Sequence, residues 1–115
     1  MKDTLLPDQL VDKAREVVEA NRKLGRTIAV AESCTGGLVS AAITEIAGSS
    51  DVFEAGYVTY SNAAKISQLK ISEDVVDTFG AVSVATACAA IPSRRPVKPR
   101  PSVVVALMLT CSSFT

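Results

Sequence analysis

The chain contains no histidine and no tryptophan, and aromatic side chains make up only 4% of its 115 residues. The lack of imidazole excludes a Ser-His-Asp triad, a Cys-His pair and a His-ligated metal site. Any catalytic base must therefore be a lysine, a carboxylate, a tyrosine or a thiolate. The three cysteines lie at unrelated spacings, which form neither a disulfide framework nor a zinc motif, and we predict that they are reduced thiols.

Long apolar runs are also lacking. The longest, Val103–Leu109, is far shorter than the roughly 20 apolar residues that a bilayer span needs, so it is interpreted as a strand or an apolar tail. The N-terminus has no apolar region typical of a signal peptide. The formal net charge is zero, so no global charge indicates nucleic acid or an anionic membrane. We therefore expect a cytoplasmic protein with neither of these partners.

Charge and proline are unevenly distributed along the chain. All twelve acidic residues lie at or before Asp77, whereas residues 88–115 contain four basic residues and no acidic one. Four of the five prolines fall between Pro92 and Pro101, a stretch that fits neither a helix interior nor a central strand. This change predicts a domain at 1–87, followed by a divergent, basic, proline-rich tail. No aromatic side chains are interleaved with the four cations, which argues against stacking on nucleic-acid bases.

Apolar periodicity predicts alternating helices and strands in the first part of the chain. The pattern indicates an α/β fold, with a three-layer-type sheet covered by helices on its faces and with the C-terminal part of the domain missing or replaced. The predicted elements are a helix from Pro7 to about Leu24, a strand at 27–31, a helix at 38–47, a strand at 53–60, and short helices after Ser61 or Asn62, after Ser72 and after Ser83.

The first candidate site is the polar, glycine-rich turn at 32–37. It joins the end of a buried strand to the start of a helix, the position where open α/β sheets bind ligands. Free N–H groups at such a turn attract anions, and Gly36 and Gly37 allow a phosphate to approach the backbone. The alternative is that the two glycines only make a tight turn. Cys34 is the weaker nucleophile, because no histidine can activate it.

The second candidate is the group of Ser50, Tyr60 and Lys65. A serine hydroxyl attacks an amide only if a base removes its proton, and here a neutral lysine is the available base. A dry pocket would lower the lysine pKa enough for this role. Tyr60 could relay the proton or hold the lysine in place. The alternative is that Lys65 is a solvated surface residue and Tyr60 is ordinary packing.

Four motifs in this order resemble the CinA C-terminal domain family, from residue 8 to about residue 87. They are Ala-Glu-Ser-Cys-Thr-Gly-Gly at 31–37, Ala-Gly-Ser-Ser at 47–50, Val-Thr-Tyr-Ser-Asn-x-x-Lys at 58–65, and Phe-Gly-Ala-Val-Ser at 79–83. The known activity of this family is nicotinamide-nucleotide amidase. The resemblance therefore implies hydrolysis of nicotinamide mononucleotide to nicotinate mononucleotide and ammonia, a step of pyridine nucleotide salvage in NAD metabolism.

The resemblance also implies roles for individual residues. It assigns Ser50 as the nucleophile, Lys65 as the general base and Tyr60 as its partner, with Ser33 as the competing nucleophile. Ser33 otherwise lines the substrate pocket, which the resemblance completes with Thr35, Gly36, Gly37 and Asn62. No metal and no organic cofactor are implied, and the partners are a small nucleotide substrate and a possible second copy of the chain. The alternative function is an inactive remnant or a nucleotide-binding module without turnover.

The tail departs from the family pattern. The family continues after Ser83 with a Gly-Pro-x-Gly-Gly loop and a Lys-Pro-x-Gly-Thr segment, and neither occurs here. We hypothesise that residues from about 88 onward arise from a frameshift or from an error in the gene sequence. The test is to translate the other two reading frames of the DNA downstream of codon 87. Absence of the glycine-rich loop from both frames would contradict the hypothesis.

Overall fold

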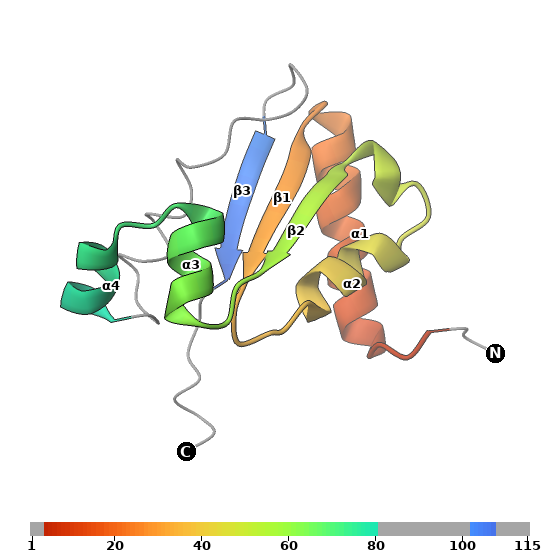
Figure 1. Ribbon diagram of the computed structural model, residues 1–115. Coiled ribbons are helices and arrows are strands. Elements are labelled where there is room, and N and C mark those ends of the chain that lie inside the picture. The colour runs from red at the N-terminus through yellow and green to blue at the C-terminus, as the bar shows by residue number, and fades with distance from the viewer. Residues whose placement is uncertain (1–3, 81–101, 108–115) are drawn as a thin grey trace.

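The sheet has three parallel strands in the computed structural model, which describes residues 4–80 and 102–107. Strand β1 (Thr27–Glu32) lies in the middle, between β2 (Phe53–Val58) and β3 (Ser102–Leu107). Parallel strands of this kind are buried on both faces, which fits the nearly continuous apolar sequence of β1. Figure 1 shows the three strands side by side, with helices on both flanks.

The helices begin and end close to the predicted positions. Helix α1 (Asp8–Lys23) follows Pro7, and its C-cap is Leu24. Proline tolerates this position because the first helical N–H groups have no intrahelical partner. The other helices of the described residues are α2 (Leu38–Glu45), the 3-10 turn η1 (Ser49–Asp51), α3 (Asn62–Leu69) and α4 (Glu73–Phe79).

Two elements end two residues earlier than predicted. Helix α2 stops at Glu45 rather than at residue 47, because Ile46 is already extended. Strand β2 stops at Val58 rather than at residue 60, which leaves Thr59 and Tyr60 in the connection to α3. Ser61 is the N-cap of α3 as predicted, and its hydroxyl accepts a hydrogen bond from Ala64 N at 3.0 Å.

The two faces of the sheet carry separate apolar clusters, so the α/β fold with helices on both faces is confirmed. Alternate residues of a strand point to opposite faces. Helices α1 and α2 pack on one face, in a cluster that contains Ala14, Val18, Ile28, Val30, Ala42 and Ile43. Helices α3 and α4 pack on the other, in a cluster of Ala31, Leu69, Ile71 and Val76 with Tyr57 against it.

Gly56 allows α2 to approach β2 closely. A Cβ atom at this position would lie 3.2 Å from Ser40 Cβ and 3.3 Å from Phe53 Cζ, tighter than ordinary packing allows. The missing side chain therefore leaves room for Ser40, which takes part in the buried network described below.

Strand β3 comes from the segment predicted to lie outside the domain. It pairs in parallel with β1 along its whole length, from Thr27 opposite Ser102 to Glu32 opposite Leu107. These six residues therefore belong to the sheet, although charge and proline content place them in the tail. The rest of the 88–115 segment, including its proline-rich stretch and any frameshift boundary, lies outside the described residues. No helix in the described ranges combines the length and the apolar character that crossing a bilayer requires.

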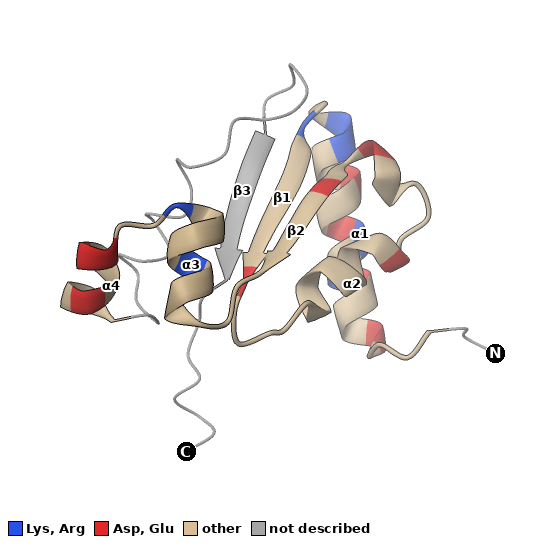
Figure 2. Cartoon of the chain, in the orientation of Figure 1, with Lys and Arg blue, Asp and Glu red and all other residues tan. Residues whose placement is uncertain are grey.

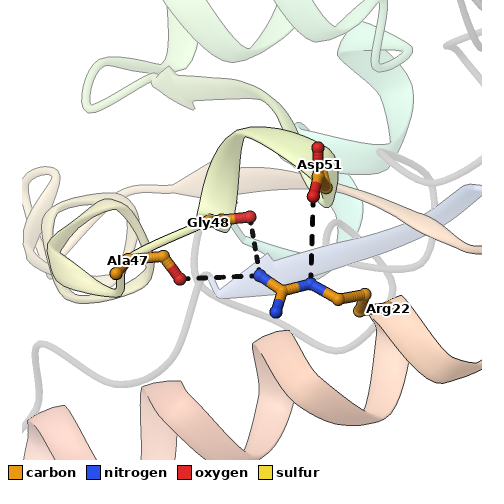
Figure 3. Close-up of polar contacts among 4 residues, drawn as sticks. All are labelled: Arg22, Ala47, Gly48 and Asp51. Atoms are coloured by element: carbon orange, nitrogen blue, oxygen red, sulfur yellow. Dashed lines mark hydrogen bonds and ion pairs between the residues drawn. The ribbon is translucent and has the colours of Figure 1, made fainter.

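Arg22 fastens the end of α1 to the loop between α2 and β2. Its Nη2 donates hydrogen bonds to Gly48 O at 2.8 Å and to Ala47 O at 3.5 Å, and its Nε lies 4.0 Å from Asp51 Oδ2 (Figure 3). These partners lie far from Arg22 in sequence but adjacent in space. The guanidinium thus holds the start of β2 against α1.

We expect Arg22→Ala to lower the free energy of unfolding by about 0.5–1.5 kcal/mol, the usual net value of such hydrogen bonds. Arg15→Ala is the matched control on the same helix, because the contact of Arg15 is an exposed pair with Asp12 at 3.5 Å. That variant should change the stability by less than ~0.5 kcal/mol. Urea unfolding followed by circular dichroism measures both variants, and equal losses would contradict a specific role for Arg22.

Candidate active site

Three polar side chains are buried together where the strands end. Ser33, Thr59 and Lys65 are exposed by only 2%, 0% and 1%. Ser33 directly follows β1, Thr59 directly follows β2, and Lys65 lies in α3. Lysine is almost never fully buried without a reason, so this cluster is the candidate site.

The strand register places Ser33 and Thr59 next to each other. The last paired residues are Glu32 and Val58, and Thr59 N continues the ladder by donating to Glu32 O at 2.8 Å. Two positions earlier, Ala31 pairs with Tyr57, and both pack on the face that carries α3. Because a strand repeats every two residues, Ser33 and Thr59 extend the same row toward the carboxyl edge.

Lys65 lies over this row. Leu69, four residues later on the same face of α3, packs in the cluster that contains Ala31. Helix α3 runs back against the direction of β2 (Figure 1), so Lys65 lies nearer the carboxyl edge than Leu69 does. Figure 2 shows this basic position on α3 and the acidic positions along α4.

Burial lowers the pKa of Lys65, because removal from water disfavours the ammonium form. A lysine must be neutral to accept a proton, so this environment favours its use as a base. The structure rules out the alternative that Lys65 is a solvated surface residue.

Glu32 lies at the end of β1 and is fully buried beneath α2. Its Oε1 accepts hydrogen bonds from Thr35 Oγ1 at 2.8 Å and from Val39 N at 2.9 Å. Its Oε2 accepts from Ser40 Oγ at 2.6 Å and from Ser40 N at 3.1 Å. Burial acts to raise the pKa of Glu32, but the bonds from Ser40, Val39 and Thr35 outweigh it and hold the pKa below its ordinary value.

The buried carboxylate changes the interpretation of the turn at 32–37. The N–H groups of Val39 and Ser40, in the first turn of α2, are already bonded to Glu32, which occupies the position an external anion would take. Gly36 and Gly37 have φ values of 61° and 105°, which glycine adopts without strain. Thr35 also donates to Glu32, so Thr35 and both glycines have structural roles in the turn. Their predicted contacts with substrate remain predictions.

The structure does not bring the predicted group of Ser50, Tyr60 and Lys65 together. Ser50 is exposed in η1, which precedes β2, whereas Lys65 follows the other end of that strand. A six-residue strand spans about 20 Å, so the two residues lie at opposite edges of the sheet. Tyr60 is 67% exposed, and Asn62 is exposed at the first position of α3.

The residue that sequence reasoning missed is Thr59. It lies within the third motif, but that motif favours Tyr60, whose hydroxyl is the more familiar proton relay. The register of the two strands carries the signal that identifies Thr59, and this register depends on tertiary structure.

Cys34 is half-buried and disulfide-bonded, so the prediction that all three cysteines are reduced is wrong for this residue. A sulfur in a disulfide is not a thiolate, which removes Cys34 as a nucleophile in this structure. Within residues 4–80 and 102–107, no group of three or more acidic or sulfur ligands could hold a metal ion. The absence of a metal or an organic cofactor remains a prediction.

Comparison with known proteins gives a consistent family. The family model described as CinA C-terminal domain matches residues 11–95. A nicotinamide-nucleotide amidohydrolase PncC from Enterobacter agglomerans is 53% identical over 68 residues, which are 59% of this chain and 42% of that protein. The PncC protein of Escherichia coli is 47% identical over 75 residues, 65% of this chain and 46% of that protein.

Solved structures resemble the same part of the chain. The crystal structure of the competence/damage inducible protein CihA from Agrobacterium tumefaciens has a TM-score of 0.74 and 43% identity, and the match covers 78% of this chain and 55% of that one. The chain thus spans about half the length of these relatives.

Proposed function

This chain belongs to the CinA C-terminal domain family, and on that premise we propose that its site hydrolyses the carboxamide of nicotinamide mononucleotide. The products would be nicotinate mononucleotide and ammonia, a reaction of pyridine nucleotide salvage. The relatives named nicotinamide-nucleotide amidohydrolase support the substrate. The observation that carries the proposal is a buried lysine on the same face of the sheet as a buried serine, in a protein without histidine.

We propose Ser33 as the nucleophile in place of Ser50. Ser33 is buried at the carboxyl edge, on the face that Lys65 covers, whereas Ser50 is exposed at the opposite edge. A nucleophile and its base must come within hydrogen-bonding reach, and only Ser33 has a position from which this is feasible. The motifs alone leave both serines open, and the buried position of Ser33 supports this choice.

The reaction follows from these two groups. Ser33 Oγ attacks the carboxamide carbon while the neutral Lys65 amine takes the hydroxyl proton. Lys65 then returns this proton to the departing nitrogen, ammonia leaves, and an acyl ester remains on Ser33. A water molecule, deprotonated by Lys65, cleaves the ester, which releases the carboxylate and restores the serine hydroxyl.

The experiment measures ammonia release from nicotinamide mononucleotide by the purified chain and by two serine variants. Ser33→Ala should lower kcat by at least about 100-fold, since the nucleophile is removed. Ser50→Ala should keep kcat within about threefold, because its side chain is exposed at the other edge. The opposite result would return the role to Ser50.

The alternative is nucleotide binding without turnover. Isothermal titration with nicotinamide mononucleotide separates the two functions. Binding without ammonia release would identify a binding module, and release of ammonia would identify the enzyme.

A further inference from the structure

The side-chain hydroxyl of Thr59 is buried but unpaired within the part of the chain that the structure describes. The residue is 0% exposed, and its Oγ1 has no hydrogen-bond partner among the described residues. Most buried polar side-chain atoms in proteins are paired, and an unpaired one lowers stability. A valine of nearly the same shape would avoid this cost. The presence of a hydroxyl here therefore requires an explanation.

The position of Thr59 limits what its hydroxyl can contact. The residue continues the β1–β2 ladder beside Ser33, on the face that α3 covers. Lys65, also buried, lies over this row. A buried hydroxyl can bond only to groups that adjoin it, and among the described residues the other buried polar side chains on this face at the carboxyl edge are those of Ser33 and Lys65.

Proton transfer creates a requirement that Thr59 can meet. A neutral lysine amine has two N–H donors and one lone pair, whereas the ammonium form has three donors. When Lys65 takes the Ser33 proton, a dry pocket must therefore supply one more acceptor. A preplaced acceptor stabilises the charge as it develops and needs no reorganisation at that moment.

From this geometry we propose that Thr59 is a positioning residue, whose hydroxyl accepts a hydrogen bond from Lys65 once Lys65 has taken the Ser33 proton. The inference rests on the proposed function, which supplies the roles of Ser33 and Lys65. The Thr59 hydroxyl oxygen thus accepts this hydrogen bond while Lys65 carries its positive charge, and not in the resting state.

The neutrality of the hydroxyl is important. A carboxylate in the place of Thr59 would stabilise the ammonium form permanently and would leave Lys65 unable to accept a proton. The buried carboxylate of this region, Glu32, belongs by strand alternation to the other face and is bonded to α2. The sheet thus separates the buried anion from the lysine, and Thr59 offers an acceptor without a charge.

The test uses the full chain with Thr59→Val, which keeps the shape, and Thr59→Ser, which keeps the hydroxyl. With nicotinamide mononucleotide, Thr59→Val should lower kcat roughly 10- to 100-fold, the effect of losing a hydrogen bond to a charged group. KM should stay within about twofold, because the bond forms only during the reaction. Thr59→Ser should recover most of kcat. The melting temperature of Thr59→Val should be unchanged or higher.

A second measurement does not depend on the substrate. A small sulfonyl fluoride reacts with an activated serine hydroxyl, and mass spectrometry gives the rate of labelling at Ser33. Thr59→Val should slow this labelling by a factor similar to the loss in kcat, and Thr59→Ser should restore it. Ser33→Ala, which cannot be labelled at this position, is the blank.

The outcomes distinguish the two proposals. If the wild type releases ammonia and Thr59→Val matches it in kcat and labelling rate, the inference on Thr59 is wrong and the amidase function stands. If the wild type releases no ammonia but Thr59→Val slows labelling and Thr59→Ser restores it, the inference stands without the proposed substrate. A loss in Thr59→Val that accompanies a lower melting temperature and is not restored by serine overturns the inference. A wild type that neither releases ammonia nor labels at Ser33 overturns both.

Discussion

Replacing Lys65 with methionine is expected to abolish ammonia release and, at the same time, to make the protein more stable. The loss in kcat should be about 10²–10⁴-fold, the usual contribution of a general base. Methionine fills the space of the lysine stem without a group that must be desolvated. Replacement of a buried ion by an apolar residue of similar volume is neutral or stabilising, by up to about 4 kcal/mol. Activity assays and urea unfolding of the same preparation measure both effects.

The pKa of Lys65 gives this prediction a dependence on pH. Its ordinary value is 10.5, and burial lowers it in the folded protein. Between the folded pKa and 10.5 the unfolded chain binds more protons, so wild-type stability rises with pH across this window. The stability advantage of Lys65→Met should therefore be largest at neutral and lower pH and should shrink as pH approaches 10.5. The wild-type kcat/KM should rise with pH as the folded amine loses its proton and should level off above the folded pKa of Lys65.

Lys23→Met is the control, because Lys23 is exposed on α1. It should leave kcat unchanged. A Lys65→Met variant that keeps its activity would exclude Lys65 as the base. A variant that unfolds at lower urea concentration than the wild type at neutral pH would show that the amine stabilises the fold.

Replacing Glu32 with glutamine is expected to remove about 1.5–3 kcal/mol of stability, the usual contribution of hydrogen bonds to a charged group, although the two side chains have almost the same shape. Each carboxylate oxygen accepts hydrogen bonds from two donors, Thr35 Oγ1 and Val39 N on one side and Ser40 N and Oγ on the other. The amide NH₂ of glutamine must face one of these pairs in either orientation, and each pair contains a backbone N–H, which cannot accept a hydrogen bond. A protein is stable by only ~5–15 kcal/mol, so this variant loses much of the total.

The pKa of Glu32 predicts that the free energy of unfolding depends on acid through this carboxylate, and Glu32→Gln lacks that dependence. The folded pKa lies below the ordinary value of 4.5. The contribution of the carboxylate is therefore present above about pH 4.5 and is lost as pH falls through the folded pKa. The difference in unfolding free energy between wild type and Glu32→Gln should shrink over that range.

Glu16→Gln is the matched control. Glu16 makes an exposed ion pair with Lys13 at 3.1 Å, and such pairs contribute little. Its loss should change stability by less than ~0.5 kcal/mol at neutral pH. Equal effects of the Glu16 and Glu32 variants at neutral pH would contradict the anchoring role of Glu32.

The candidate site shows how far motif reasoning extends. The resemblance of the motif at 58–65 to the family, in a chain without histidine, predicts Lys65 as the base. Its partner could not be selected, since Ser33 and Ser50 both occur in family-like motifs. The choice between the two serines depends on which end of a parallel strand each one adjoins. After β1 the chain returns through α2, so Ser50 lies just before β2, at the edge of the sheet opposite Lys65.

Composition also gave an incomplete account of the domain. The acid-free, proline-rich segment predicts a tail, but local charge does not determine which strands pair. Ser102–Leu107 pairs in parallel with β1, and this pairing cannot be read from the charge or the proline content of the surrounding segment.

The sequence by itself determined the α/β class, the positions of most helices and strands, and the restriction of catalysis to a base other than histidine. These properties depend on local periodicity and on which chemical groups are present. Only the tertiary structure decided that Glu32 serves α2 whereas Ser33, Thr59 and Lys65 share the opposite face. The physical reason is that strand register and alternation bring residues from separate segments together on one buried face of the sheet. Register and alternation are fixed only when the strands have paired.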